Sequence, residues 1–234
     1  TSKGIGLPTA RIFHTAIWTG SEMVIWAGYG GSNTGGRYNP VADSWIATST
    51  GGNVPSSRDS HSAVWTGSEM IVWGGTYNLA TYLNTGGRYS PSTNSWLPTS
   101  LGTAAPTSRI HHTAVWTGNE MVIWGGYPGG GVYLNTGGRY SPFSDSWKPT
   151  STGMNVPVSR EYHTAVWTGN VMMIWGGNYL DSGGIYSSGS VPSPGNSLRG
   201  GKSSYINLNS STIYGSGSSM SKPGTPTTTP LIPD

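Results

Sequence analysis

Histidine is the first residue type in this sequence whose spacing suggests chemistry, because it recurs at one fixed place. Each of four histidines stands three residues after an arginine: His14, His61, His112 and His163. Four such side chains around an axis would offer a metal site, but metal ligands are usually of mixed type at irregular positions. A residue kept in every copy of a repeat more often serves the repeat. We therefore predict structural histidines at the starts of strands, each arginine hydrogen-bonded to a neighbouring repeat, and neither metal nor cofactor.

Three titratable residues break the repeated pattern and are the candidates for a unique site. His111 is the one histidine outside the recurring set, and Asp59 and Glu161 stand where the other copies carry isoleucine. A carboxylate pair acts as general acid and base only from unique, facing positions, which the glutamate recurring in a turn of the repeat does not offer. Asp59 and Glu161 are thus the candidate acid–base pair and His111 a candidate ligand contact. No fuller catalytic constellation is identifiable, so we predict that the chain is not an enzyme.

Composition excludes several other classes of site. The sequence has no cysteine, which removes disulfides, cysteine–zinc sites and thiol nucleophiles. The 12 lysines and arginines exceed the 9 aspartates and glutamates by only three, and the arginines recur one per repeat position instead of forming a basic tract. We therefore predict no nucleic-acid partner. No run of about 18 apolar residues occurs, so no membrane span is predicted.

The elements that position these residues come from a repeat whose copies begin near Arg11, Arg58, Arg109 and Arg160. In the first copy, residues 14–18 are rich in β-branched and aromatic side chains and predict a strand. A glycine-containing turn leads to residues 23–26, an apolar run that suits burial on both faces. Further strands are predicted around 37–38 and from about 44. Four short strands joined by turns predict an all-β antiparallel meander, the blade of a propeller.

The repeat resembles the kelch repeat. The matching residues are Gly74-Gly75, Tyr89 and Trp96 in the second copy and Gly125-Gly126, Tyr140 and Trp147 in the third. The resemblance covers residues 1–186 and implies a kelch-type β-propeller, or a partial one, of about four four-stranded antiparallel blades. Kelch propellers include copper radical oxidases similar to galactose oxidase, but their chemistry needs a cysteine cross-linked to tyrosine, which this sequence lacks. The resemblance also implies a second enzyme class on the same fold, the sugar mutarotases.

The ends of the chain depart from the repeat. Residues 1–10 match the end of a preceding unit, so residues 1–186 are assigned to blades and residues 187–234 to a Gly-, Ser-, Thr- and Pro-rich segment. Residues 205–208 and 211–214 are candidate strands that would complete the fourth blade, and the remainder would dock on a partner. A closed four-bladed ring, an open arc and an arc completed by a second chain all fit. An open arc would expose an apolar face and favour association.

The loops after the glycine doublets vary between copies and carry tyrosines among Gly, Asn and Thr. These are Tyr29, Tyr77, Tyr82, Tyr127, Tyr133 and Tyr179. Tyrosine with small polar neighbours is typical of recognition surfaces. Two interpretations stay open: a binding surface for protein or carbohydrate, or tyrosines that cover the blade edges.

Together these features favour a non-catalytic protein-interaction or structural module. The low charge, the absent cysteine and the Thr/Pro-rich end favour a secreted, periplasmic or cell-surface assembly with a protein partner or self-association. The alternatives are a lectin-like propeller that binds glycan through the tyrosine loops and an enzyme similar to kelch sugar mutarotases.

Overall fold

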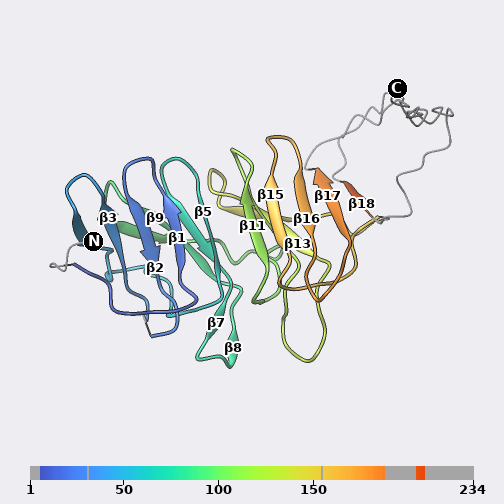
Figure 1. Cartoon of the computed structure of the whole chain (residues 1–234), viewed down its shortest axis with the longest axis horizontal. Coiled ribbons are helices and arrows are strands. Elements are labelled where there is room, and N and C mark those ends of the chain that lie inside the picture. The colour runs from blue at the N-terminus through green and yellow to red at the C-terminus, as the bar shows by residue number, and fades with distance from the viewer. Residues whose placement is uncertain (1–5, 31, 154, 188–203, 209–234) are drawn as a thin grey trace, which may run out of the picture.

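The computed structural model describes residues 6–30, 32–153, 155–187 and 204–208, the last range by its backbone alone. Four four-stranded antiparallel sheets follow one another along the molecule (Figure 1). The first blade contains β1 (Thr15–Trp18), β2 (Met23–Trp26), β3 (Gly35–Asn39) and β4 (Ser44–Ala47). The second contains β5 (Ser62–Trp65), β6 (Met70–Trp73), β9 (Gly86–Ser90) and β10 (Ser95–Pro98). The third contains β11 (Thr113–Trp116), β12 (Met121–Trp124), β13 (Gly137–Ser141) and β14 (Ser146–Pro149). The fourth contains β15 (Thr164–Trp167), β16 (Met172–Trp175), β17 (Gly183–Ser187) and β18 (Ser204–Leu208), and the predicted all-β, propeller-like fold is confirmed.

A small hairpin and the fourth strand of the last blade lie outside the repeated frame. The hairpin, β7 (Thr76–Tyr77) with β8 (Thr81–Tyr82), sits in the variable loop of the second blade. β18 pairs with β17 and takes the place that β14 has in the third blade. The candidate strand at 211–214, and residues 1–5 of the leading segment, lie outside the described residues. Within the described part, no helix is long and apolar enough to cross a membrane.

The turn between the first two strands of each blade is built from threonine and glycine. The Thr19 hydroxyl accepts a hydrogen bond from the Glu22 amide at 2.9 Å, and the Thr19 amide donates to the Glu22 carbonyl at 2.9 Å. Gly20 between them has φ +102°, a conformation that costs glycine little. The recurring glutamate has a separate role, because its carboxylate lies 3.6 Å from the guanidinium of Arg37 on β3.

The core lies between consecutive blades. The innermost strands β1, β5, β11 and β15 are neighbours in that order, and three clusters of buried side chains fill the three junctions. The burial on both faces predicted for residues 23–26 is found in the equivalent strands β6 and β12, but in β2 itself Met23 and Ile25 are only half-buried. Among the described residues no such cluster joins the fourth blade to the first, and the two lie at opposite ends of the long axis (Figure 1). The four blades thus form an open arc.

The recurring arginine closes the loop of its own blade. Nη1 of Arg58 donates to the carbonyl oxygens of Gly74 at 3.0 Å and Thr85 at 2.6 Å, and both acceptors belong to the same blade. The predicted hydrogen bond from this side chain to a neighbouring repeat is therefore wrong. The bond to the neighbour comes from the backbone, since the Arg58 carbonyl accepts from the amide of Gly28 in the preceding blade at 2.8 Å. Burial lowers the pKa of Arg58 to about 10.

The recurring histidine ties each blade to the preceding one, which confirms its predicted structural role. Nε2 of His61 is hydrogen-bonded to the Thr15 hydroxyl at 2.8 Å, and His163 bonds Thr113 in the same way at 2.8 Å. Both rings are buried. Burial, followed by the nearby arginine charge, lowers the pKa of His61 to about 3 and that of His163 to about 4. These histidines are therefore neutral at ordinary pH.

Candidate functional site

One position in every repeat has a left-handed backbone and a different side chain. It lies between the recurring arginine and histidine and is occupied by Phe13, Ser60, His111 and Tyr162, with φ of 57°, 54°, 53° and 56°. Non-glycine residues seldom adopt positive φ, and bulky ones still less, because of the steric cost. Backbone hydrogen bonds hold the conformation, as the Ser60 amide donates to the Phe13 carbonyl at 3.3 Å across the blade junction. Such strain, kept in all four copies while the side chain changes, is typical of functional positions.

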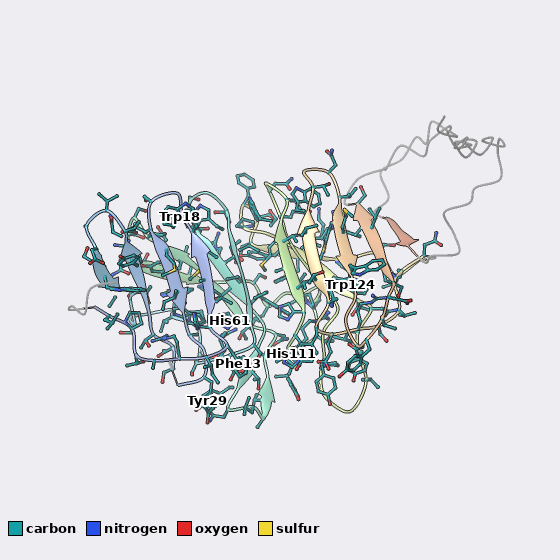
Figure 2. The ribbon with its side chains drawn as sticks, viewed as in Figure 1. Phe13, Trp18, Tyr29, His61, His111 and Trp124 are labelled. Carbon is teal, nitrogen blue, oxygen red and sulfur yellow. The ribbon has the colours of Figure 1, made fainter. Side chains whose placement is uncertain are left out.

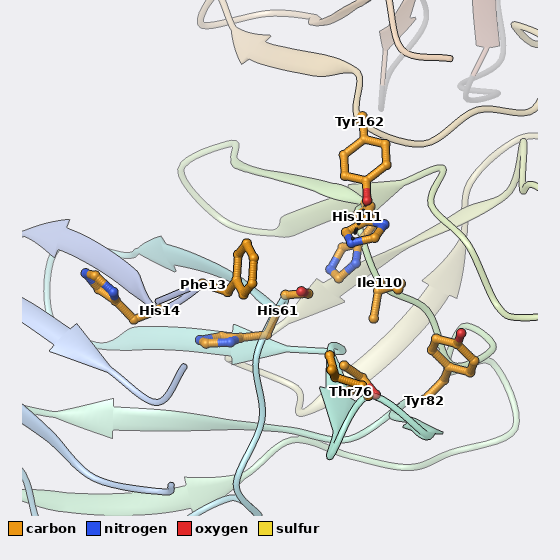
Figure 3. A pocket seen from close by; sticks show the side chains of 11 residues that line it. Phe13, His14, His61, Thr76, Tyr82, Ile110, His111 and Tyr162 are labelled. Atoms are coloured by element: carbon orange, nitrogen blue, oxygen red, sulfur yellow. Dashed lines mark hydrogen bonds between the residues drawn. The ribbon is translucent and has the colours of Figure 1, made fainter. Parts of the chain in front are cut away.

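All four of these side chains line one pocket, which we call the axial pocket (Figure 3). It has a volume of about 450 Å³ and lies at the N-terminal ends of the innermost strands. Leu79, Tyr82 and Ile110 add aliphatic and aromatic surface, and His61 and His112 also line the pocket. Figure 2 shows Phe13 and His111 near each other on one side of the arc, with Trp18 on the opposite side. The backbone strain therefore directs the variable residues of all four repeats into a common cavity.

A polar contact between the third and fourth blades lies at the axial pocket. Nδ1 of His111 lies 2.7 Å from Oε2 of Glu161, and the Tyr162 ring stacks on His111 with centroids 4.1 Å apart. The Tyr162 hydroxyl is 3.2 Å from Nε2 of His111 (Figure 3). Burial and then the Glu161 charge raise the pKa of Tyr162, so the phenol stays protonated and is no nucleophile. The trio instead offers a fixed aromatic surface with hydrogen-bonding capacity.

A second hollow adjoins the first, shares Tyr162 with it and is also lined by Glu161. We call it the loop pocket; it has a volume of about 570 Å³ and is otherwise lined by Tyr133, Gly177, Asn178 and Tyr179. The side-chain oxygen of Asn178 accepts from the Glu161 amide at 2.7 Å, which fixes the loop against the blade. The predicted residues His111, Glu161, Tyr133 and Tyr179 are therefore brought to one continuous region.

The remaining predicted tyrosines divide between this region and the surface. Tyr127 packs against Tyr82 edge to face, with centroids 5.8 Å apart, and against Tyr133 at 5.9 Å. These three extend the aromatic surface between the two pockets. Tyr29 and Tyr77 are exposed and line neither pocket. The structure thus separates pocket-lining tyrosines from exposed ones, and a binding role for either group stays a prediction.

The predicted acid–base pair is not brought together. Asp59 is buried in the second blade, and Oδ1 accepts a hydrogen bond from the Ser60 hydroxyl at 2.9 Å. Glu161 lies in the fourth blade with His111 as its partner, and no hydrogen bond or ion pair joins the two carboxylates in the described structure. Within the described ranges, no group of three or more His, Asp or Glu side chains could hold a metal ion.

Sequence reasoning identified His111 but missed its equivalents Phe13, Ser60 and Tyr162. The sequence did contain a signal for this position. It lies between an arginine and a histidine that recur in every copy, but its own residue differs from copy to copy, so the repeat does not require one residue type there. The left-handed backbone that unites the four is a property of the folded chain. Leu79 was also missed, since it belongs to the inserted loop of a single blade.

Comparison with known proteins agrees with this architecture. A model of the KLHDC2/KLHL20/DRC7 Kelch-repeats domain matches residues 13–189, which is most of the chain and includes all but the outermost strand of the last blade. None of the curated proteins compared with the chain matches it. The match spans all four Arg-x-x-His units except the first arginine, together with the glycine doublets, tyrosines and tryptophans of the blades. The chain belongs to the kelch-repeat family.

Proposed function

We propose that this chain is a non-catalytic module that binds a segment of a partner protein at the axial pocket, within a secreted or surface-associated assembly. Kelch-repeat domains are protein-interaction modules in general terms, which supports the class. The observation that carries the proposal is the set of four different side chains, Phe13, Ser60, His111 and Tyr162, placed in one cavity by a strained backbone.

The chemistry of the pocket indicates the kind of segment. Phe13, Leu79 and Tyr82 offer an aromatic and aliphatic surface, whereas His111 with Glu161 offers one polar contact beside it. A concave site with apolar walls and few convergent polar groups suits a large apolar side chain of the partner whose backbone or neighbouring residue makes a hydrogen bond. The half-buried Glu161 also favours a positively charged neighbour in that segment.

A phage-displayed library of random peptides, panned against the whole chain, tests this proposal. We expect enriched peptides to share an aromatic or large aliphatic residue and to lose about tenfold or more in affinity for Tyr162→Ala or Phe13→Ala, as anchor side chains do. Phe143→Ala is the matched control, because Phe143 is fully exposed in a turn away from both pockets. No enrichment, or peptides that bind Tyr162→Ala as they bind the unaltered chain, would contradict it.

A second function rests on the loop pocket. Tyr179 is fully exposed there beside Asn178 and Tyr133, and a flat aromatic surface next to an amide suits a sugar ring. A glycan array probed with the chain would show specific retention that Tyr179→Ala abolishes and Tyr29→Ala leaves intact. If no glycan is retained, or if Tyr179→Ala retains it unchanged, the carbohydrate function is rejected.

A further inference from the structure

One face of the last blade is exposed, whereas the equivalent face of the other blades is buried against the next blade. We call the side of a blade that packs against the next blade in sequence its forward face. In the third blade the apolar part of this face consists of three buried side chains, Val115, Val122 and Trp124. The same positions in the fourth blade are Val166, Met173 and Trp175, with 57%, 40% and 53% of their surface exposed. Among the described residues, the forward face of the fourth blade thus lacks the cover that this sequence pattern has in the third blade.

The opposite face of the first blade, its backward face, is partly exposed in the same way. The backward face, which packs against the preceding blade, consists in the third blade of four buried side chains, Met121, Ile123, Tyr140 and Trp147. Their counterparts in the first blade, Met23, Ile25, Tyr38 and Trp45, are only half-buried. Trp18 beside them is 54% exposed. A hollow of about 460 Å³ with nearly all its lining apolar opens here, bounded by Ala16, Trp18, Met23, Tyr38 and Pro40.

The chain itself shows that these two kinds of face fit each other. Each of the three internal junctions joins one forward face to one backward face. In the first junction Trp26 packs on Trp96 with ring centroids 4.9 Å apart, and in the second Trp73 packs on Trp147 at 5.4 Å. The corresponding pair at the two ends is Trp175 and Trp45. Trp175 belongs to β16 of the fourth blade and Trp45 to β4 of the first, and these two blades lie at opposite ends of the arc (Figure 1).

The forward face of the fourth blade also has no counterpart of the charged pair found on this face in the other blades. In the first three blades a glutamate and an arginine pair on this face, as Glu69 and Arg88 do at 3.7 Å, and Arg88 donates to the Pro142 carbonyl of the next blade at 2.8 Å. In the fourth blade both partners are replaced together, by Val171 and Ile185. Ile185 pairs with Met173 in the sheet, so the apolar surface is continuous. A face without ionic groups has no charge to desolvate on burial.

We propose that a second copy of this chain covers both end faces, joining head to tail so that two four-bladed arcs close one ring. The forward face of each copy packs on the backward face of the other, in the arrangement already present at the three internal junctions. Two copies give about eight blades, within the range of about four to eight in which propellers close. Head-to-tail contacts that close under rotation form rings, whereas those that do not close form filaments. The proposal is independent of any ligand in the axial pocket.

Sedimentation velocity on the whole chain over a wide concentration range measures the assembly directly. The expected species has the mass of two chains, with a monomer only on dilution. Met173→Lys on the forward face and Ala16→Glu on the backward face should each weaken the dimer by about tenfold or more, since an unpaired charge would be buried. Both side chains are exposed in the single chain, so neither change is expected to prevent folding. Phe143→Lys, in an exposed turn, is the control and should dimerise normally.

Mixing the two variants distinguishes the geometry of the contact. In the third junction the counterparts of these positions, Val122 and Ala165, belong to one cluster, so the introduced lysine and the introduced glutamate would face each other in a mixed dimer. That dimer has one junction with the lysine–glutamate pair and one unaltered junction. The one-to-one mixture should therefore dimerise at concentrations at which each variant alone is monomeric.

Four results would overturn the proposal. The unaltered chain could remain monomeric at every concentration, or its dimer could survive both substitutions. A contact between two forward faces would instead leave Ala16→Glu fully dimeric while abolishing the Met173→Lys dimer. An open polymer whose length grows with concentration would contradict closure into a ring.

Discussion

β2 (Met23–Trp26) and β12 (Met121–Trp124) have the same sequence, Met-Val-Ile-Trp, but lie in different surroundings. All four side chains of β12 are buried, whereas Met23 and Ile25 of β2 are only half-buried. The difference follows from position in the arc, because β12 has a blade on each side and β2 has one on its forward side only. In a repeat protein the neighbour, as much as the sequence, decides which residues form the core.

The recurring histidines show the same contrast. His61, His112 and His163 are buried and each bonds a hydroxyl of the preceding blade, whereas His14 is exposed because no described blade precedes it. The end faces are therefore the part of the molecule where repeated residues have no neighbouring blade among the described residues.

The largest expected effect compares one isoleucine in the two identical strands. Ile123→Ala opens a cavity in a fully buried cluster and should cost about 2–5 kcal/mol of unfolding free energy, whereas Ile25→Ala should cost less than half as much. Chemical denaturation in the Met173→Lys background, where single chains stay apart, makes the comparison. Val24→Ala and Val122→Ala provide the control, since both valines are buried at internal junctions and should cost similar amounts. Equal costs at Ile25 and Ile123 would mean that the backward face of the first blade is covered within one chain.

The next effect is a loss of stability in acid that comes from the buried histidines. Unfolded histidine takes up a proton near pH 6.5, but burial lowers the pKa of His163 to about 4 and that of His61 to about 3 in the folded chain. Between these values the unfolded state binds more protons, so stability is complete above about pH 6.5 and is lost as the pH falls through this window. His163 alone accounts for roughly 3 kcal/mol of that loss.

Thermal unfolding as a function of pH separates buried from exposed histidines. His163→Gln, which keeps a group able to bond Thr113, should flatten the acid limb of the profile. His14→Gln is the matched variant at the exposed end and should leave the limb as it was. An acid limb unaltered by His163→Gln would show that other groups cause the loss.

Much of the fold was predictable because local and long-range signals agree in each repeat. The turn at residues 19–22, the apolar run of β2 and the pairing order of the strands all follow from residue types at short range. Four copies of that pattern make the blade unmistakable. The direction of the Arg58 side chain was wrongly predicted because its acceptors, the carbonyls of Gly74 and Thr85, are far away in sequence and carry no side-chain signature.

The candidate site was predictable only in part, because it forms between blades. His111 and Glu161 each stood out as departures from the repeat, but their 2.7 Å contact depends on how the third blade packs against the fourth. Asp59 stood out equally and proved to be buried with a local partner. A departure from the repeat thus identifies a residue with a separate role, but it does not show whether the side chain lies in a pocket or in the core.

The smallest expected effect concerns the left-handed position of the axial pocket, which is the same in end and internal blades: φ is 57° at Phe13 and 54° at Ser60. Glycine adopts this conformation without the steric cost that other residues bear, so Ser60→Gly should raise the unfolding free energy by up to about 1 kcal/mol despite the lost contact with Asp59. Ser44→Gly on β4 is the control, where extended backbone makes the same change destabilising by about 0.5–1 kcal/mol. Differential scanning calorimetry of both variants gives the sign. A higher unfolding free energy for Ser60→Gly would mean that the left-handed backbone is strained and that this strain accompanies the placing of side chains in the cavity. A lower value would show that the hydrogen bond of the serine stabilises the fold by more than the strain destabilises it.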